Sequence, residues 1–218
     1  MACVDETNPS TGAGRTYDSS GRRRAAEQRH QHVATVAAEL FAARGWTATT
    51  INGVADSAGV SPELVQRTFG GKPGLLMTAF RQASFDQDVN TRDLVASLHL
   101  DQEPDIDVRL EAIVQLACRT LAPTAPLVPV LLHAATQDDA VQALYQRARH
   151  SHRQAAHDIV ELLAPGPVPA DAGDEVTVMI LPQTYLAFTQ DLGWSNERYA
   201  AWLRRALARA VAPASPEA

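Results

Sequence analysis

Three side chains in one short stretch have the chemistry to form paired hydrogen bonds with nucleobases. The Arg67 guanidinium can donate two hydrogen bonds to the O6 and N7 acceptors of guanine. The carboxamides of Asn52 and Gln66 can each donate to and accept from adenine. Such readout needs a narrow, exposed element that enters the major groove of DNA, so the segments around these residues decide whether it can operate.

Two short helices joined by a tight turn are predicted between residues 50 and 69. Apolar residues recur at helical spacing over 51–58, and Gly59 then permits a sharp turn. Ser61 can cap a following helix that begins with Pro62, which is favoured in a first turn. The pattern predicts a helix-turn-helix, in which the exposed face of the second helix enters the major groove.

Helices are also predicted on both sides of this motif. Arg22–Arg24 open a helix whose apolar stripe runs to Phe41, and Gly45 ends it. A fourth helix begins near Lys72, and the glycines within 70–74 predict a loose connection into it.

The rest of the chain reads as further helices, so the predicted fold is all-α with about nine helices. No strand-like alternation and no internal repeat appears. We expect a disordered tail over 1–21, a helix-turn-helix domain over 22–71, a second helical domain over 72–212 and a frayed end over 213–218. The expected later helices cover 107–121, 127–137, 138–163, 174–192 and 196–211.

Residues 24–83 resemble the tetracycline-repressor (TetR) family of bacterial regulators. The resemblance is carried by "LFAARGWTATT", by "INGVADSAGVSPELVQRTF" and by "KPGLL" after it. It implies a DNA-binding transcriptional regulator whose second domain binds an effector and dimerises. The implied mode of action is a homodimeric repressor that binds palindromic operator DNA and is released by a small molecule.

The resemblance also implies roles for individual residues. Thr50 lies at a helix N-terminus where a phosphate binds, and Lys72 matches the family's phosphate-anchoring lysine. Arg22–Arg24 match a basic arm that touches DNA, although a solvated charge run is the alternative. The expected DNA-binding residues are Arg22, Arg23, Arg24, Thr50, Asn52, Ser61, Pro62, Glu63, Leu64, Gln66, Arg67, Thr68 and Lys72.

Departures from the family's pattern leave a second interpretation open. Family members usually carry an aromatic residue where Gln66 stands, and often an aromatic or a histidine at Arg67 or Thr68. Glu63 places a carboxylate on the same side, where it can accept from a cytosine amino group or hold Arg67 in place. The alternative is a small-molecule sensor with the same fold that lacks specific DNA binding.

The last two predicted helices carry apolar faces that suit pairing of two subunits, although the same faces can pack inside one subunit. In the family these helices form a four-helix dimer bundle. The expected interface residues are Val178, Leu181, Tyr185, Leu192, Tyr199, Trp202, Leu203 and Ala206. Weak candidates for an effector pocket are His133, Gln137, Gln183, Tyr185 and Phe188.

Charge and composition restrict the class of protein. The net charge is −6, but residues 22–81 carry +4 and residues 82–218 carry −8, which favours local contact with a polyanion. No run of about 18 uninterrupted apolar residues and no secretory signal appears, so we expect a cytoplasmic protein without a membrane partner. Cys118 lies in an apolar helical pattern and is predicted to be a core residue rather than a redox sensor.

Neither a cofactor nor a metal site is expected. His150 and His157 share a helix face, and His157 lies four residues from Glu161, but no third ligand follows at useful spacing. No nucleophile elbow, phosphate-binding glycine loop or Cys–His pair appears. A helical metal-dependent enzyme is therefore the least favoured alternative.

Overall fold

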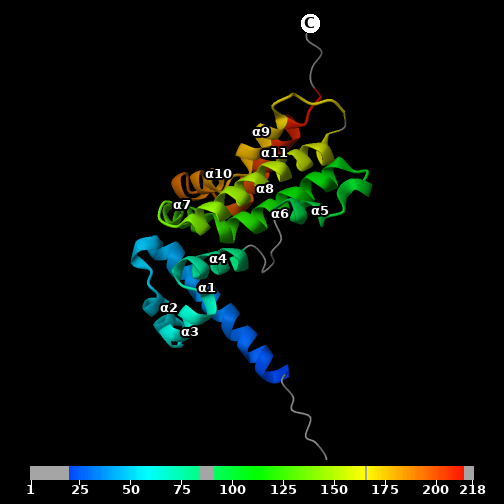
Figure 1. The fold of residues 1–218 in the computed structure, drawn as a ribbon. Coiled ribbons are helices and arrows are strands. Elements are labelled where there is room, and N and C mark those ends of the chain that lie inside the picture. The colour runs from blue at the N-terminus through cyan, green and yellow to red at the C-terminus, as the bar shows by residue number, and fades with distance from the viewer. Residues whose placement is uncertain (1–19, 84–90, 165, 214–218) are drawn as a thin grey trace, which may run out of the picture.

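The computed structural model describes residues 20–83, 91–164 and 166–213, and every regular element in these ranges is helical (Figure 1). We call residues 20–83 the head and residues 91–213 the body. Figure 1 shows the head below the body, with the first turns of α1 pointing away from both. The predicted tails, 1–21 and 213–218, lie almost wholly outside the described residues.

The head contains four helices at the predicted places. They are α1 (Ser20–Ala48), α2 (Ile51–Ala58), α3 (Pro62–Phe69) and α4 (Lys72–Ala83). Gly45 has a φ of 74° and interrupts the regular helix of α1, as the sequence predicts for a glycine near a helix end. The remaining residues of α1 run on past this kink to Ala48.

The body is a stack of helices of very different lengths. Its elements are α5 (Thr91–Ala96), a 3₁₀ turn (Leu100–Gln102), α6 (Ile106–Thr124), a second 3₁₀ turn (Ala125–Leu127), α7 (Val128–Ala135), α8 (Asp139–Leu163), α9 (Ala172–Met179), α10 (Pro182–Leu186), a π-helical turn (Ala187–Asp191) and α11 (Asn196–Ala210).

Two predicted helix boundaries were wrong. The helix expected over 174–192 is broken, because α9 ends at Met179 and Pro182 starts a new helix after an extended Leu181. Pro123 lies inside α6, and the break falls after it in the 3₁₀ turn Ala125–Leu127. The short helix α5 was not predicted.

The core of the head is closed by helices of the body. Buried Phe41 of α1 and Leu76 of α4 belong to the same apolar cluster as Leu131 and Ala134 of α7 and Val141 of α8. Removing these side chains from water is worth roughly 1.5–3 kcal/mol for each large one. The head is therefore packed against α7 and shares an apolar core with the body.

A second cluster fills the body between α6, α8, α9 and α11. Tyr199 and Leu203 of α11 are fully buried in it, and Tyr185 is 8% exposed. The Tyr199 hydroxyl donates to the Met179 carbonyl at 2.9 Å. These three side chains were expected at a subunit interface, but they face the interior of their own chain, so we remove them from that set.

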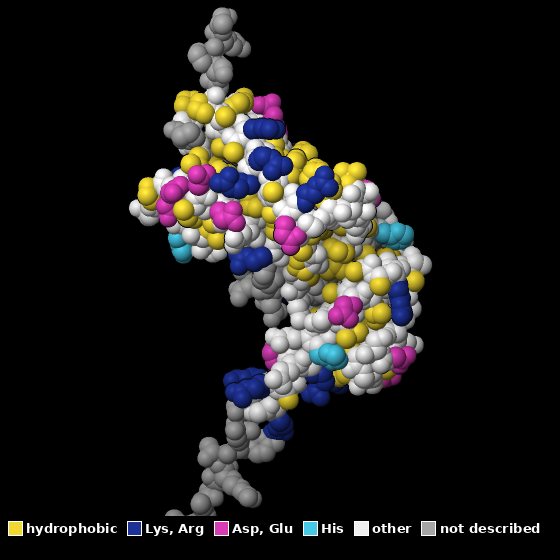
Figure 2. Space-filling view, turned by 180° about the vertical axis from the view of Figure 1, so that it is seen from behind, with side chains coloured by type: hydrophobic (Ala, Val, Ile, Leu, Met, Phe, Trp, Pro, Cys, Tyr) yellow, Lys and Arg dark blue, Asp and Glu magenta, His cyan; other side chains and the backbone are white. Residues whose placement is uncertain are grey.

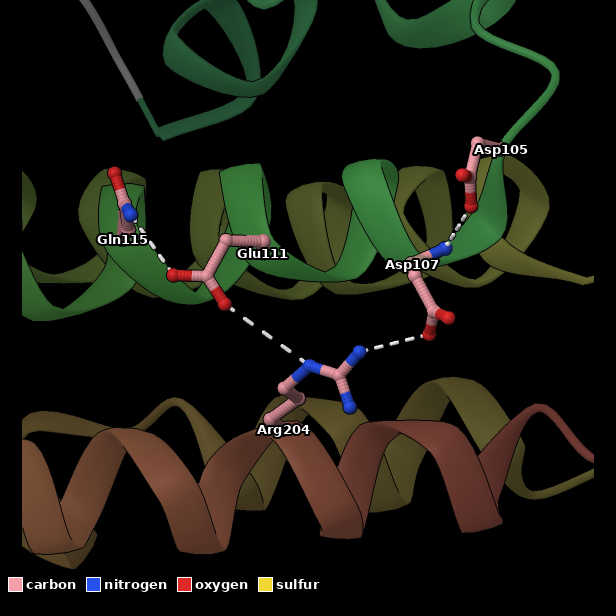
Figure 3. A network of polar contacts seen from close by, with 5 residues as sticks. All are labelled: Asp105, Asp107, Glu111, Gln115 and Arg204. Carbon is pink, nitrogen blue, oxygen red and sulfur yellow. Dashed lines mark hydrogen bonds and ion pairs between the residues drawn. The ribbon is translucent and has the colours of Figure 1, made fainter.

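An exposed polar network joins α6 to α11 (Figure 3). Arg204 of α11 lies 2.7 Å from the Asp107 carboxylate and 4.0 Å from that of Glu111. Gln115 donates to Glu111, and the Asp107 backbone N–H donates to Asp105, which caps α6. Because exposed ion pairs contribute only about 0–1 kcal/mol, this network aligns the two helices more than it stabilises them.

Cys118 is a core residue, as predicted. It is 5% exposed within the body cluster, and burial raises the pKa of its thiol to about 11. A thiol that stays protonated at neutral pH is a poor nucleophile, which argues against redox sensing at this position.

One helical segment, Ile106–Ala135, is long and apolar enough to cross a membrane by length and composition alone. Because it includes charged residues, it contains no uninterrupted apolar run of about 18 residues. Its apolar side chains form parts of both clusters, and 56% of its most apolar window is buried inside the protein. Its packing is that of core helices.

Two polar groups are buried without partners where α8 packs on α9. The Ser151 Oγ and the His152 Nε2 make no hydrogen bond in the described structure. Burial lowers the pKa of His152, and the backbone at Thr177 opposes this shift only in part. The imidazole is therefore held neutral in the folded state.

Acidification should destabilise the protein through His152. Above about pH 6.5 both the folded and the unfolded state hold a neutral imidazole, so the contribution is constant. Below that pH the unfolded state takes up a proton that the folded state resists, and the free energy of unfolding falls. Denaturant titrations at pH 7.5 and 5.5 should show a smaller loss in His152→Leu than in the parent. Ser151→Ala, a neutral change beside it, should keep the parental loss.

Gly74 is expected to be intolerant of any side chain. A Cβ added there would lie 1.9 Å from the Phe69 carbonyl oxygen, so α3 or α4 would have to move. Gly74→Ala should lower the free energy of unfolding by about 1–3 kcal/mol, the usual cost of overpacking. Gly21→Ala, in a helix with open space around it, should be neutral or stabilising in the same thermal or denaturant melts. Equal effects of the two substitutions would contradict this explanation.

Candidate nucleic-acid interface

The turn before α2 is built by two adjacent threonines with different tasks. The hydroxyl of buried Thr49 donates to the carbonyls of Gly45 at 2.9 Å and Leu40 at 3.1 Å, which holds the kinked end of α1. The Thr50 hydroxyl accepts from the Gly53 N–H at 3.0 Å and caps α2. Of the two adjacent threonines, Thr50 is therefore the cap of α2. Its exposed side chain stands at the positive end of the α2 dipole.

The turn between α2 and α3 has the predicted form. Gly59 adopts a left-handed conformation with φ 66°, and its N–H returns to carbonyls of α2. Ser61 caps α3 by accepting from the Leu64 N–H at 3.2 Å, and Pro62 follows at the first helical position. These local devices set the direction in which α3 leaves α2.

The two faces of α3 differ completely. Val65 and Phe69 are buried against the head, and the Phe69 ring stacks on His30 of α1 with centroids 4.8 Å apart. The opposite face is polar and exposed, and Pro62 and Leu64 lie half-buried at its edges. Its exposed residues are Ser61, Glu63, Gln66, Arg67 and Thr68.

The polar groups of this face are not used inside the chain. Arg67 and Glu63 form no ion pair or hydrogen bond within the described residues, so Glu63 does not hold Arg67 in place here. The Gln66 amide lies above Gly71, where a Cβ would meet its Nε2 at 3.5 Å. Asn52 on α2 is also exposed. These side chains keep their hydrogen-bonding capacity for another molecule.

The junction between α3 and α4 is tight, not loose as the glycine content suggested. Gly70 and Gly71 have φ values of 71° and 104°, which other residues rarely adopt. Together with the close approach of Gly74 to Phe69, they bring α4 directly beside α3. The start of α4, where Lys72 stands, is therefore fixed relative to the exposed face of α3.

Lys72 rests on an aromatic ring near the end of α1. Its ammonium lies 4.2 Å from the centroid of the Trp46 ring, a cation–π contact, and partial burial lowers its pKa. The Trp46 indole N–H in turn donates to the Gln137 carboxamide at 3.1 Å. Gln137 also lies 3.2 Å from a ring nitrogen of His133 on α7. A chain of contacts thus runs from the body to Lys72.

Sequence reasoning missed this chain of contacts. Trp46 and Gln137 are 91 residues apart, and no periodicity or motif relates them. The sequence identified Lys72 only through the family resemblance, and the ring beneath it was not anticipated. A tryptophan directly after the helix-ending Gly45 was the one available signal.

The basic residues at the start of α1 stand apart from the rest of the head. Arg22, Arg23 and Arg24 are exposed on the first turns of the helix. Figure 2 shows basic side chains gathered at the lower end of the molecule, where α1 begins. Over the body, the face seen in Figure 2 carries basic and acidic side chains mixed together.

The expected pocket residues do not converge on one site. His133 and Gln137 lie near the head, Gln183 is exposed on α10, and Tyr185 is buried in the body. Phe188 packs among Trp194, Tyr199 and Trp202 with centroids 4.3–5.9 Å apart, which leaves no space between the rings for a ligand. Among the described residues, no three His, Cys, Asp or Glu side chains gather as a metal would require.

The remaining interface candidates are accessible in the single chain. Val178 is 57% exposed and Leu192 is 63% exposed, so two large apolar side chains face solvent here. Leu181, Trp202 and Ala206 are half-buried.

We compared the chain with models of known protein families and with solved structures. Residues 34–78 match the family model described as bacterial regulatory proteins, tetR family. That segment covers the end of α1, the whole helix-turn-helix and most of α4. No curated protein matches the chain.

Solved structures share the fold over most of the chain. A putative TetR-family transcriptional regulator from Rhodococcus sp. has a TM-score of 0.63 and 20% identity, covering 85% of this chain and 100% of that one. A putative transcriptional regulator from Saccharomonospora viridis, in complex with choline, has a TM-score of 0.61 and 22% identity, covering 83% and 95%. NalD, the secondary repressor of the MexAB-OprM multidrug efflux pump in Pseudomonas aeruginosa, has a TM-score of 0.59 and 18% identity, covering 85% and 97%.

The two comparisons address different parts of the protein. The structural likeness, at these identities, is a likeness of fold. The family model matches the segment that carries the DNA-binding motif, and it describes regulatory proteins and not an enzyme family. Residues 34–78 thus resemble bacterial regulatory proteins of the tetR family, and 85% of the chain shares its fold with a putative TetR-family transcriptional regulator.

Proposed function

We propose that the protein is a cytoplasmic repressor that binds palindromic operator DNA as a homodimer and releases it when a small molecule binds. The observation that carries the proposal is the exposed face of α3. It presents Gln66 and Arg67 without partners in the described chain, while Val65 and Phe69 anchor the opposite face. A rigid helix with unpaired donors on one side is the form that direct base readout requires.

The proposed contacts divide into two kinds. Arg67, Gln66 and Asn52 read base edges, because their forked or paired groups match guanine and adenine. Thr50, Lys72 and the arm Arg22–Arg24 position the head on the phosphate backbone. Ser61, Pro62, Glu63, Leu64 and Thr68 line the contact surface between them.

The division of labour between domains follows from the same geometry. We propose that residues 22–71 contact DNA and that residues 72–212 bind the effector and pair the subunits. The exposed apolar side chains Val178 and Leu192, with Leu181, Trp202 and Ala206 at the margin, favour pairing through the α9–α11 side of the body. Repression is supported by the fold shared with NalD, and small-molecule control by the relative solved with choline.

Base readout is tested by Arg67→Ala. In gel shifts with DNA from upstream of its own gene, the substitution should cost about 1–3 kcal/mol at one base position and relax specificity there. The measurement compares the matched site with single-base variants and with a scrambled duplex. An equal loss on matched and scrambled DNA would exclude base readout by this residue. If the parent protein gives no shift even at low salt, the same-fold sensor without specific DNA binding becomes the better interpretation.

Phosphate anchoring is tested by Lys72→Ala. Affinity should fall alike for all sequences, and the slope of log K against log salt should flatten by about one unit, because one counterion fewer is released. Lys72→Arg, which keeps the charge, should retain the parental slope. An unchanged slope in Lys72→Ala would place the lysine outside the DNA contact.

A further inference from the structure

The joint between head and body contains an open groove of about 460 Å³. Its walls come from the end of α1, from α7 and from the π-helical turn after α10, which Figure 1 shows meeting at one side of the molecule. Apolar walls are provided by Trp46, Pro129, Val130 and Leu186. This volume lies within the range of small-molecule sites, about 300–1,000 Å³.

The only formal charge among the lining residues of the groove is positive. Arg44 is the charged side chain among its lining residues, His133 and Gln190 add hydrogen-bonding groups, and no carboxylate lines it. Arg44 forms no hydrogen bond or ion pair within the described part of the chain. A neighbouring groove of similar size contains Glu39 and no cationic side chain, so it offers the opposite environment.

We propose that the groove at the head–body joint binds a small amphipathic anion, with an apolar body between Trp46 and the prolines and a carboxylate at Arg44. A guanidinium offers a carboxylate two parallel hydrogen bonds, and it has no internal competitor here. The apolar walls cover part of the ligand's apolar body, and removing that surface from water favours binding. This site differs from the aromatic cluster of the body, which is closed.

The groove is connected to the proposed DNA contact through one ring. Trp46 forms a wall of the groove, receives Lys72 at 4.2 Å and is held by Gln137 at 3.1 Å. His133, which lies beside Gln137, is a second wall residue. A ligand that disturbs the Trp46–Gln137 hydrogen bond therefore shifts the support under Lys72. This consequence rests on the proposed function, whereas binding to the groove does not.

The site is tested with 2-naphthoate as the probe, in equilibrium dialysis without DNA. One molecule should bind per chain, and Arg44→Gln should weaken binding at least tenfold. Ala48→Trp, which fills this groove from its wall and does not line the neighbouring one, should also weaken binding. Arg119→Gln, an exposed arginine that lines neither groove, serves as the matched control and should bind as the parent does. Circular dichroism melts confirm that each variant is folded.

The charge preference is tested with two comparators. The alcohol 2-naphthalenemethanol should bind at least tenfold more weakly than the carboxylate, and choline should not compete with it. The proposal is overturned if Arg44→Gln binds 2-naphthoate as tightly as the parent, if the alcohol binds equally well, or if no saturable binding occurs.

The coupling is tested separately on protein–DNA complexes. Saturating 2-naphthoate should lower the DNA affinity of the parent at least tenfold. Gln137→Leu should still bind the probe but lose this effect on DNA, because its bond to Trp46 is absent. If the parent binds 2-naphthoate but no DNA, the proposed function fails and the site stands. If DNA binding is intact and the parent does not bind the probe, the site fails and the proposed function stands.

Discussion

The head cannot complete its apolar core without α7, and this shared core is the constraint on which the rest of the structure depends. Phe41 and Leu76 lie in one cluster with Leu131 and Ala134, so the head and the body bury their apolar surface together. A rotation of the head would expose part of this cluster to water, at about 25 cal/mol for each Å² uncovered. The direction of α3 is therefore set by the body, and a change in the position of α7 shifts α3, the helix that we propose contacts DNA.

The features that the sequence could predict are the local ones. Thr50, Gly59 and Ser61 act within a few residues of their positions, because caps and left-handed glycines depend on the neighbouring backbone alone. The break before Pro182 was missed because the apolar stripe of the predicted helix 174–192 runs across it without interruption. Helix existence and the helix-turn-helix were therefore predictable, whereas exact helix ends in the body were not.

Contacts between residues that are far apart in the chain could not be predicted from a single sequence. An apolar helix face does not say whether it meets its own subunit or another, so Tyr199 and Leu203 were placed at an interface although they are fully buried. The bond between Trp46 and Gln137 joins two residues that no spacing relates. The exposed positions of the candidate DNA surface could be predicted because they lie on two consecutive helices, whereas the support of this surface by the body could not.

The first turns of α1 have a mechanical consequence. Before His30 meets Phe69, the nine residues 21–29 of the helix project from the head with exposed side chains, a length of about 14 Å at 1.5 Å per residue. A tilt of α1 by about 10° at that stacking contact would move its tip by about 2 Å. The projecting helix thus acts as a lever. A small change in the His30–Phe69 stacking contact produces a larger displacement of Arg22–Arg24.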